Sequence, residues 1–143
     1  MFSDLLRRLQ SPRPAPLPEL DGRLALGALL VRMAKVDHHY AVEQIRRIDR
    51  ILAARFDLNP VEAAKMRADC ERLEADAPDG ERFAEMVRAS MPLEERRGLL
   101  TAMWQVALAD GVHRSEEDAM LERNASRLGL GHEDVEAARP QTD

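Results

Sequence analysis

Apolar side chains recur at every third or fourth position through most of this sequence, for example at Leu26, Leu30 and Met33. An α-helix turns once in about 3.6 residues, so this spacing places the apolar side chains on one face of a helix. Aromatic residues make up only 3% of the chain, and Ala, Leu, Glu and Arg predominate. Those four residues favour helices, whereas sheets draw on aromatic and β-branched residues. We therefore predict an all-α fold.

The chain of 143 residues has the length of one domain with a sizeable core. Its first ten residues, MFSDLLRRLQ, place their apolar side chains on one helical face. They predict a short amphipathic helix that docks on the domain, on a partner or on a membrane surface. The next ten, SPRPAPLPEL, contain four prolines and indicate an extended linker. We divide the chain into this segment, 1–20, and a helical domain, 21–143.

The compartment and partners are limited by charge and hydropathy. The longest apolar run, Leu24 to Val31, is much shorter than the roughly 20 residues of a membrane span. Asp4, Arg7 and Arg8 lie where a signal peptide needs apolar residues. The net charge is −5, and the basic residues are scattered, which is not the pattern of a nucleic-acid-binding surface. We expect a cytoplasmic protein that does not bind nucleic acid.

Capping residues divide the apolar pattern into helices. Asn59 and Pro60 supply a cap and a preset first turn, Ser115 can cap the helix after it, and Gly129 and Gly131 are typical of a helix end. The pattern predicts seven helices, over residues 22–37, 42–55, 60–76, 80–90, 93–110, 116–128 and 132–139.

The sequence aligns with itself at an offset of 73 positions. This offset lays DGRLALGALLVRMAKVDHHYAVEQIRRIDRIL over EERRGLLTAMWQVALADGVHRSEEDAMLERNA. Ala34 then pairs with Ala107 and Glu43 with Glu116. Beyond them, a small change of offset pairs VEAAK at 61–65 with VEAAR at 135–139. The alignment predicts an internal duplication in which two similar helical hairpins pack together.

Two aspartates fall at the same place in the two copies. Asp37 lies on the helical stripe of Leu26, Leu30 and Met33. The second copy repeats this stripe with Leu99, Met103, Val106 and Asp110. A carboxylate at the end of a buried stripe is costly unless it is hydrogen-bonded, paired or bound to a cation.

The helix after the second aspartate adds another inward carboxylate. Glu117 shares a face with Leu121 and Leu128, whereas Glu116 falls on the flank. We therefore expect Asp110 and Glu117 to converge across the turn. In the first copy Gln44 replaces Glu117, Glu43 lies beside it, and the turn holds His38 and His39.

These carboxylates have two interpretations. In the first, each Asp accepts backbone N–H groups and fixes its hairpin, and the carboxylates after Ser115 serve the helix start. In the second, they bind a divalent cation. The expected ligands are Asp37, Asp110, Glu117 and Glu43, with Glu116 as an accessory residue. Such oxygen ligands suit Ca²⁺, Mg²⁺ or Mn²⁺, and His38, His39 or His113 would shift the preference toward Zn²⁺.

Four other residues are assigned structural roles. Trp104 and Tyr40 are expected in the core or at an interface. Cys70 lies on the apolar side of its helix and is expected to be a small buried hydrophobe. His132 is expected to be a surface residue at a helix start.

The stretch ALADGVHRSEED, with a weaker echo in MAKVDHHYAVEQ, resembles the TerB-like family of tellurite-resistance-associated domains, which also occur fused to J-domain co-chaperones. The resemblance implies an all-α bundle of two similar halves with acidic residues near the turns. It further implies a metal-binding or interaction module associated with stress responses. The family's Asp falls on Asp110 and its Glu on Glu117, while the first copy has His38 for Gly and Gln44 for Glu.

Three functional hypotheses follow. The leading one is a non-enzymatic interaction domain that binds a divalent cation and has an unknown protein partner. The alternative is a metal-assisted hydrolase that uses the same carboxylates with a bound water. The third is a structural oligomer, such as a homodimer, in which Trp104 or the N-terminal helix makes the contact.

Overall fold

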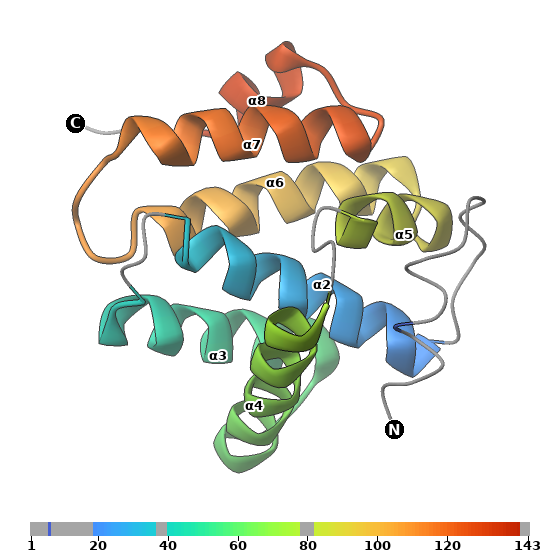
Figure 1. Ribbon diagram of the computed structural model, residues 1–143, viewed down its shortest axis with the longest axis vertical. Helices are drawn as coiled ribbons and strands as arrows, with labels where there is room; N and C mark the ends of the chain where they lie inside the picture. Colours follow the sequence, from blue (N-terminus) through green and yellow to red (C-terminus); the bar gives the residue numbers. More distant parts are fainter. Residues whose placement is uncertain (1–5, 7–18, 37–39, 78–81, 141–143) are drawn as a thin grey trace.

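The computed structural model describes residues 6, 19–36, 40–77 and 82–140. Within these ranges the chain forms seven helices and no strand, labelled here as in Figure 1. They are α2 (Glu19–Ala34), α3 (Val42–Phe56), α4 (Pro60–Asp76), α5 (Arg82–Ser90), α6 (Leu93–Ala107), α7 (Ser115–Arg127) and α8 (His132–Ala138). The predicted all-α fold is confirmed.

Helix α2 is the central element of the fold. Figure 1 shows it between α3 and α4 on one side and α6 on the other, with α7 and α8 beyond α6. From Leu24 to Ala34 every residue is buried except Arg32, which faces Glu74 of α4 at an Nη1 to Oε2 distance of 3.6 Å. A helix that is apolar on all sides is stable only when other helices enclose it, so α2 fixes how the rest of the chain packs.

The N-terminal segment is described only at Leu6. This residue is helical and packs against the core. The rest of the predicted amphipathic helix, and residues 11–18 of the predicted linker, lie outside the described residues. No helix of the described chain has the length and apolar character needed to cross a membrane.

Two helices end three residues earlier than predicted. Helix α2 ends at Ala34 rather than at residue 37, and α6 ends at Ala107 rather than at residue 110. Beyond Ala107 the chain tightens into a turn, in which Gly111 N donates to Leu108 O over 3.0 Å. The carboxylate Oδ1 of Asp110 then accepts from Val112 N over 3.1 Å. Asp110 therefore serves the turn and does not end a helical stripe.

The helix starts were predicted only in part. The pair Asn59 and Pro60 begins α4 as expected, and Asn59 Oδ1 accepts from Glu62 N over 2.8 Å. Ser115 does not cap α7: it is the first helical residue and is exposed, and Arg114 holds the cap position. The cap oxygen comes instead from Glu117, as described below. The predicted helix end at Gly129 is confirmed, with a φ of +78°.

Helix α4 approaches α2 at a glycine. A Cβ added to Gly27 would lie 2.2 Å from Cys70 Sγ, so no larger residue fits without a shift of the helices. Cys70 is fully buried, as predicted. Burial, with help from the neighbouring charges of Asp69 and Glu71, raises the pKa of the Cys70 thiol to about 12.

Helix α8 is attached to α6 by the single tryptophan. Trp104 is 1% exposed, and its Nε1 donates to Val135 O of α8 over 3.0 Å. The expected core position of Trp104 is confirmed. Tyr40 is half-buried beside the core, and its burial, with Glu71 nearby, raises its pKa.

Candidate functional site

The turn between α6 and α7 holds the first of the predicted acidic ligands. The side chain of Asp110 is 11% exposed, and its Oδ2 accepts from Arg114 Nη1 over 3.0 Å. Gly111, with a φ of +79°, supplies the left-handed backbone that reverses the chain directly after Asp110. The turn thus orients the Asp110 carboxylate back toward the start of α7.

The second predicted ligand lies inside the protein. Glu117 is fully buried in the first turn of α7, and its Oε1 accepts from Arg114 N over 3.0 Å. Its Oε2 lies 3.9 Å from Arg114 Nη1. The inward orientation of Glu117 is confirmed, and the bond to Arg114 N replaces the cap predicted for Ser115.

The arginine between these residues supplies a positive charge to both carboxylates. Arg114 lies four positions after Asp110 and three before Glu117, and its side chain is 23% exposed. A charged donor compensates part of the desolvation of a buried carboxylate. Arg114 was not among the predicted site residues, although its spacing from Asp110 and Glu117 is visible in the sequence.

The first turn is described on both sides of residues 37–39. The candidate ligands Asp37, His38 and His39 lie outside the described residues. Glu43 is exposed on α3, whereas Gln44 is fully buried, and its Oε1 accepts from Ala41 N over 3.0 Å. The described part of this turn therefore has the same backbone cap as α7, built from a neutral amide.

The remaining predicted ligands lie on the surface. His113 Nε2 lies 2.8 Å and 2.9 Å from the two carboxylate oxygens of Asp118, and its ring centroid lies 6.4 Å from that of Trp104. Glu116 is exposed. Among the described side chains, no group of three possible metal ligands includes Asp110 or Glu117. The structure therefore brings Asp110 and Glu117 together at Arg114. It places His113 beside Asp118.

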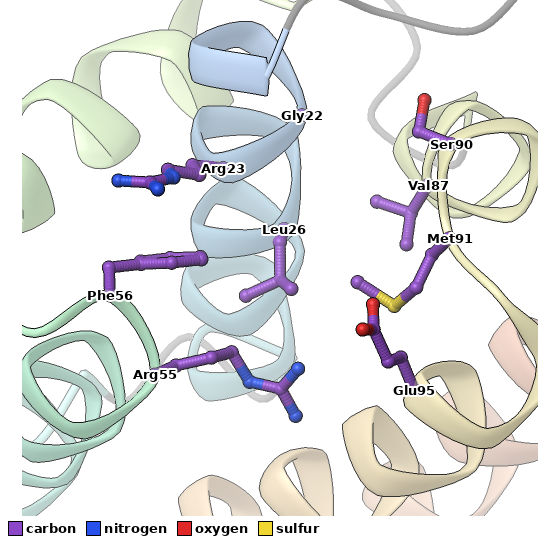
Figure 2. Close-up of a pocket in the computed structure, with 9 residues that line it drawn as sticks. All are labelled: Gly22, Arg23, Leu26, Arg55, Phe56, Val87, Ser90, Met91 and Glu95. Carbon is purple, nitrogen blue, oxygen red and sulfur yellow. The ribbon is translucent and has the colours of Figure 1, made fainter.

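A cavity of about 530 Å³, which the sequence did not predict, lies between the start of α2, the end of α3, and α5 with the start of α6 (Figure 2). Arg23 and Arg55 project from one side with Phe56 between them, and Glu95 projects from the other. The Arg23 guanidinium carbon lies 4.8 Å from the centroid of the Phe56 ring. The complete lining is Gly22, Arg23, Leu26, Arg55, Phe56, Val87, Ser90, Met91 and Glu95, and it includes none of the predicted ligands.

Comparison with protein-family models gave a match. A model of the family described as tellurite resistance protein TerB matches residues 23–140. The searches of curated proteins and of solved structures gave no match. The matched range contains α3 to α8 complete and includes Asp110, Arg114 and Glu117.

Proposed function

Since the match spans most of its length, this chain belongs to the TerB family, and we propose that it is a non-enzymatic interaction domain that binds a divalent cation at the α6–α7 turn. The observation that carries the proposal is the convergence of Asp110 and Glu117 on one guanidinium, that of Arg114. Two carboxylates that meet at one guanidinium bring the oxygen atoms that a divalent cation prefers to the same turn.

The proposed ion replaces the Arg114 side chain between the carboxylates. That side chain is partly exposed, so it can rotate toward solvent when a cation enters. Carboxylate and backbone carbonyl oxygens are the ligands that Ca²⁺, Mg²⁺ and Mn²⁺ prefer. Asp37 and Glu43 are proposed as further ligands from the first turn, and His38, His39 or His113 would move the preference toward Zn²⁺.

The proposed role is association with a protein partner in a stress response, in keeping with the description of the family. The hydrolase alternative requires a nucleophile or a bound water beside a general base in an open cleft. No lining residue of the described cavity belongs to the acidic turn, and the comparisons give the hydrolase no support.

The decisive experiment is calorimetric titration of the metal-stripped protein with Ca²⁺, Mg²⁺, Mn²⁺ and Zn²⁺. We expect one of these ions to bind, and we expect the double variant Asp110→Asn, Glu117→Gln to bind it at least about tenfold more weakly, a loss of about 1.4 kcal/mol. Glu95→Gln is the matched control, because it removes an exposed carboxylate from the first turn of α6 that is not among the proposed ligands. Unchanged binding in the double variant, or no binding by the folded protein, would refute the proposal.

A further variant tests the replacement of the arginine. If the cation and the Arg114 guanidinium compete for the same oxygens, Arg114→Gln strengthens binding, because the ion no longer displaces a positive charge. Weaker binding in this variant would mean that Arg114 supports the site rather than competing with the ion.

A further inference from the structure

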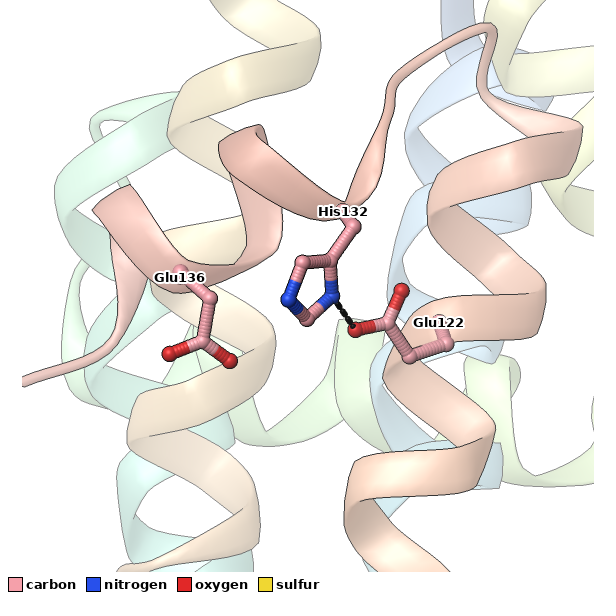
Figure 3. A group of neighbouring side chains, drawn as sticks. All are labelled: Glu122, His132 and Glu136. Atoms are coloured by element: carbon pink, nitrogen blue, oxygen red, sulfur yellow. Dashed lines mark hydrogen bonds and ion pairs between the residues drawn. The ribbon is translucent and has the colours of Figure 1, made fainter.

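Three side chains that sequence reasoning assigned no role in a site face one another on the outer surface of α7 and α8. Glu122 belongs to α7, and His132 and Glu136 belong to α8. One ligand atom from each of the three lies within 4.8 Å of the other two. Figure 3 shows the imidazole of His132 between the two carboxylates, with one ring nitrogen on the side of each. The Nδ1 atom lies 2.5 Å from Glu122 Oε1.

We propose that Glu122, His132 and Glu136 bind a zinc ion that links α7 to α8. This site shares no residue with the acidic turn between α6 and α7, so it does not depend on the function proposed above. One imidazole nitrogen and two carboxylate oxygens form a set of three protein ligands of the types that Zn²⁺ takes. The imidazole favours Zn²⁺ over Ca²⁺ and Mg²⁺, which prefer oxygen alone.

The backbone places the three ligands where one ion can reach them. His132 and Glu136 are four positions apart, and residues at this spacing lie on the same face of a helix. Glu122 comes from the neighbouring helix, so the ion would join two elements rather than bind along one. The side chain of His132 is 69% exposed and that of Glu122 is 40% exposed. This exposure leaves a coordination position open to water.

The separations of the three ligand atoms can be compared with those that a zinc ion imposes. Ligand atoms at about 2.0–2.2 Å from a tetrahedral zinc lie about 3.3–3.6 Å from one another. The contact between Glu122 and His132 is shorter than this, and the 4.8 Å limit of the group is longer. The ion would therefore replace the proton that the imidazole and Glu122 now share, while Glu136 moves closer. Two carboxylates and a neutral imidazole carry two negative charges, which balance Zn²⁺. A metal binds the neutral imidazole, so one proton leaves His132 when zinc enters.

The test is titration of the full chain with ZnCl₂ after metal removal, followed by calorimetry and by Trp104 fluorescence. Trp104 donates to Val135 O, and Val135 lies between His132 and Glu136 in α8, so the single tryptophan reports on the helix that carries two ligands. We expect one zinc ion per chain, and at least tenfold weaker binding in His132→Gln and in Glu136→Gln. Glu133→Gln is the matched control, because it removes an exposed carboxylate of α8 that is not one of the three ligands.

The possible outcomes separate this site from the acidic turn. Zinc binding that is retained in Asp110→Asn, Glu117→Gln and lost in His132→Gln supports the site on α7 and α8, whatever happens at the turn. Binding that is lost only in Asp110→Asn, Glu117→Gln assigns the zinc to the turn and overturns this proposal. No binding at millimolar zinc, or equal binding in His132→Gln, also overturns it. Thermal melts of all the variants check that the fold is kept.

Discussion

The α2–α3 turn and the α6–α7 turn use the same buried cap with a different charge. Gln44 and Glu117 correspond at the offset of 73, both are fully buried, and each accepts a hydrogen bond from the backbone N–H three residues earlier. The donor is Ala41 in one turn and Arg114 in the other. An amide oxygen is therefore enough to begin the helix, and the carboxylate of Glu117 adds a charge that the cap does not need. That additional charge accompanies an arginine at the position where the first turn has an alanine.

The helices that cover the two hairpins differ in a second way. Helix α4 packs closely against α2 because Gly27, which has no side chain, faces Cys70. Helix α8 reaches α6 through the largest side chain of the protein, Trp104. The contact of α4 with α2 therefore depends on close approach and that of α8 with α6 on filled volume, and each dependence can be tested.

The largest loss of stability is expected at Trp104, which fills the space between α6 and α8. Trp104→Ala should destabilise the fold by about 3–5 kcal/mol, because it leaves a cavity and removes the donor to Val135 O. Urea unfolding followed by circular dichroism measures this change. Trp104→Phe keeps most of the ring and should lose much less. A loss below about 1 kcal/mol for Trp104→Ala would show that α8 contributes little to the core.

The next effect tests the charge difference between the two turns. Gln44→Glu places a carboxylate in a buried cap that has Ala41 in place of an arginine, and should destabilise the protein by about 3 kcal/mol at pH 7. Burial would raise the pKa of the new carboxyl above its unfolded value, so this loss should shrink as the pH falls. Denaturant unfolding at pH 5 and pH 7 checks the sign.

The reverse exchange, Glu117→Gln, should cost only about 1 kcal/mol, because the amide keeps the cap and leaves Arg114 with Asp110. Equal losses for the two exchanges would contradict the view that the charge of Glu117 is additional to the cap. A loss of cation binding in Glu117→Gln with little loss of stability would support the function proposed for this turn.

The close approach of α4 to α2 predicts a loss of stability that a second substitution partly restores. Gly27→Ala should destabilise the fold by about 1–3 kcal/mol, since its Cβ would lie 2.2 Å from Cys70 Sγ. The double variant with Cys70→Ala removes that sulfur and should recover part of the loss, which a double-mutant cycle measures. Losses that simply add would show that the two residues do not limit how closely α2 and α4 approach.

The sequence predicted the parts of this molecule that local chemistry decides. Helix α4 was predicted at both ends, because Asn59 and Pro60 fix its start. The end of α6 was missed, because Ala and Leu favour helix up to Asp110 and only the turn geometry stops it. The approach of His132 to Glu122 depends on how α8 packs against α7, and a single sequence holds no signal for that packing.

The smallest expected effect is a pH dependence of stability at the start of α8. Helix α4 begins with the uncharged cap Asn59, whereas His132 at the start of α8 forms an ion pair with Glu122. That contact raises the pKa of His132, so its contribution to stability is complete below the ordinary histidine pKa and is lost as the pH rises through the raised value. NMR titration of the imidazole in metal-free buffer should show the raised pKa, and Glu122→Gln should lower it. An unchanged titration in Glu122→Gln would mean that Glu136 and Glu133, rather than Glu122, set the charge of His132. In that case packing, and not the ion pair with Glu122, would hold the start of α8 against α7.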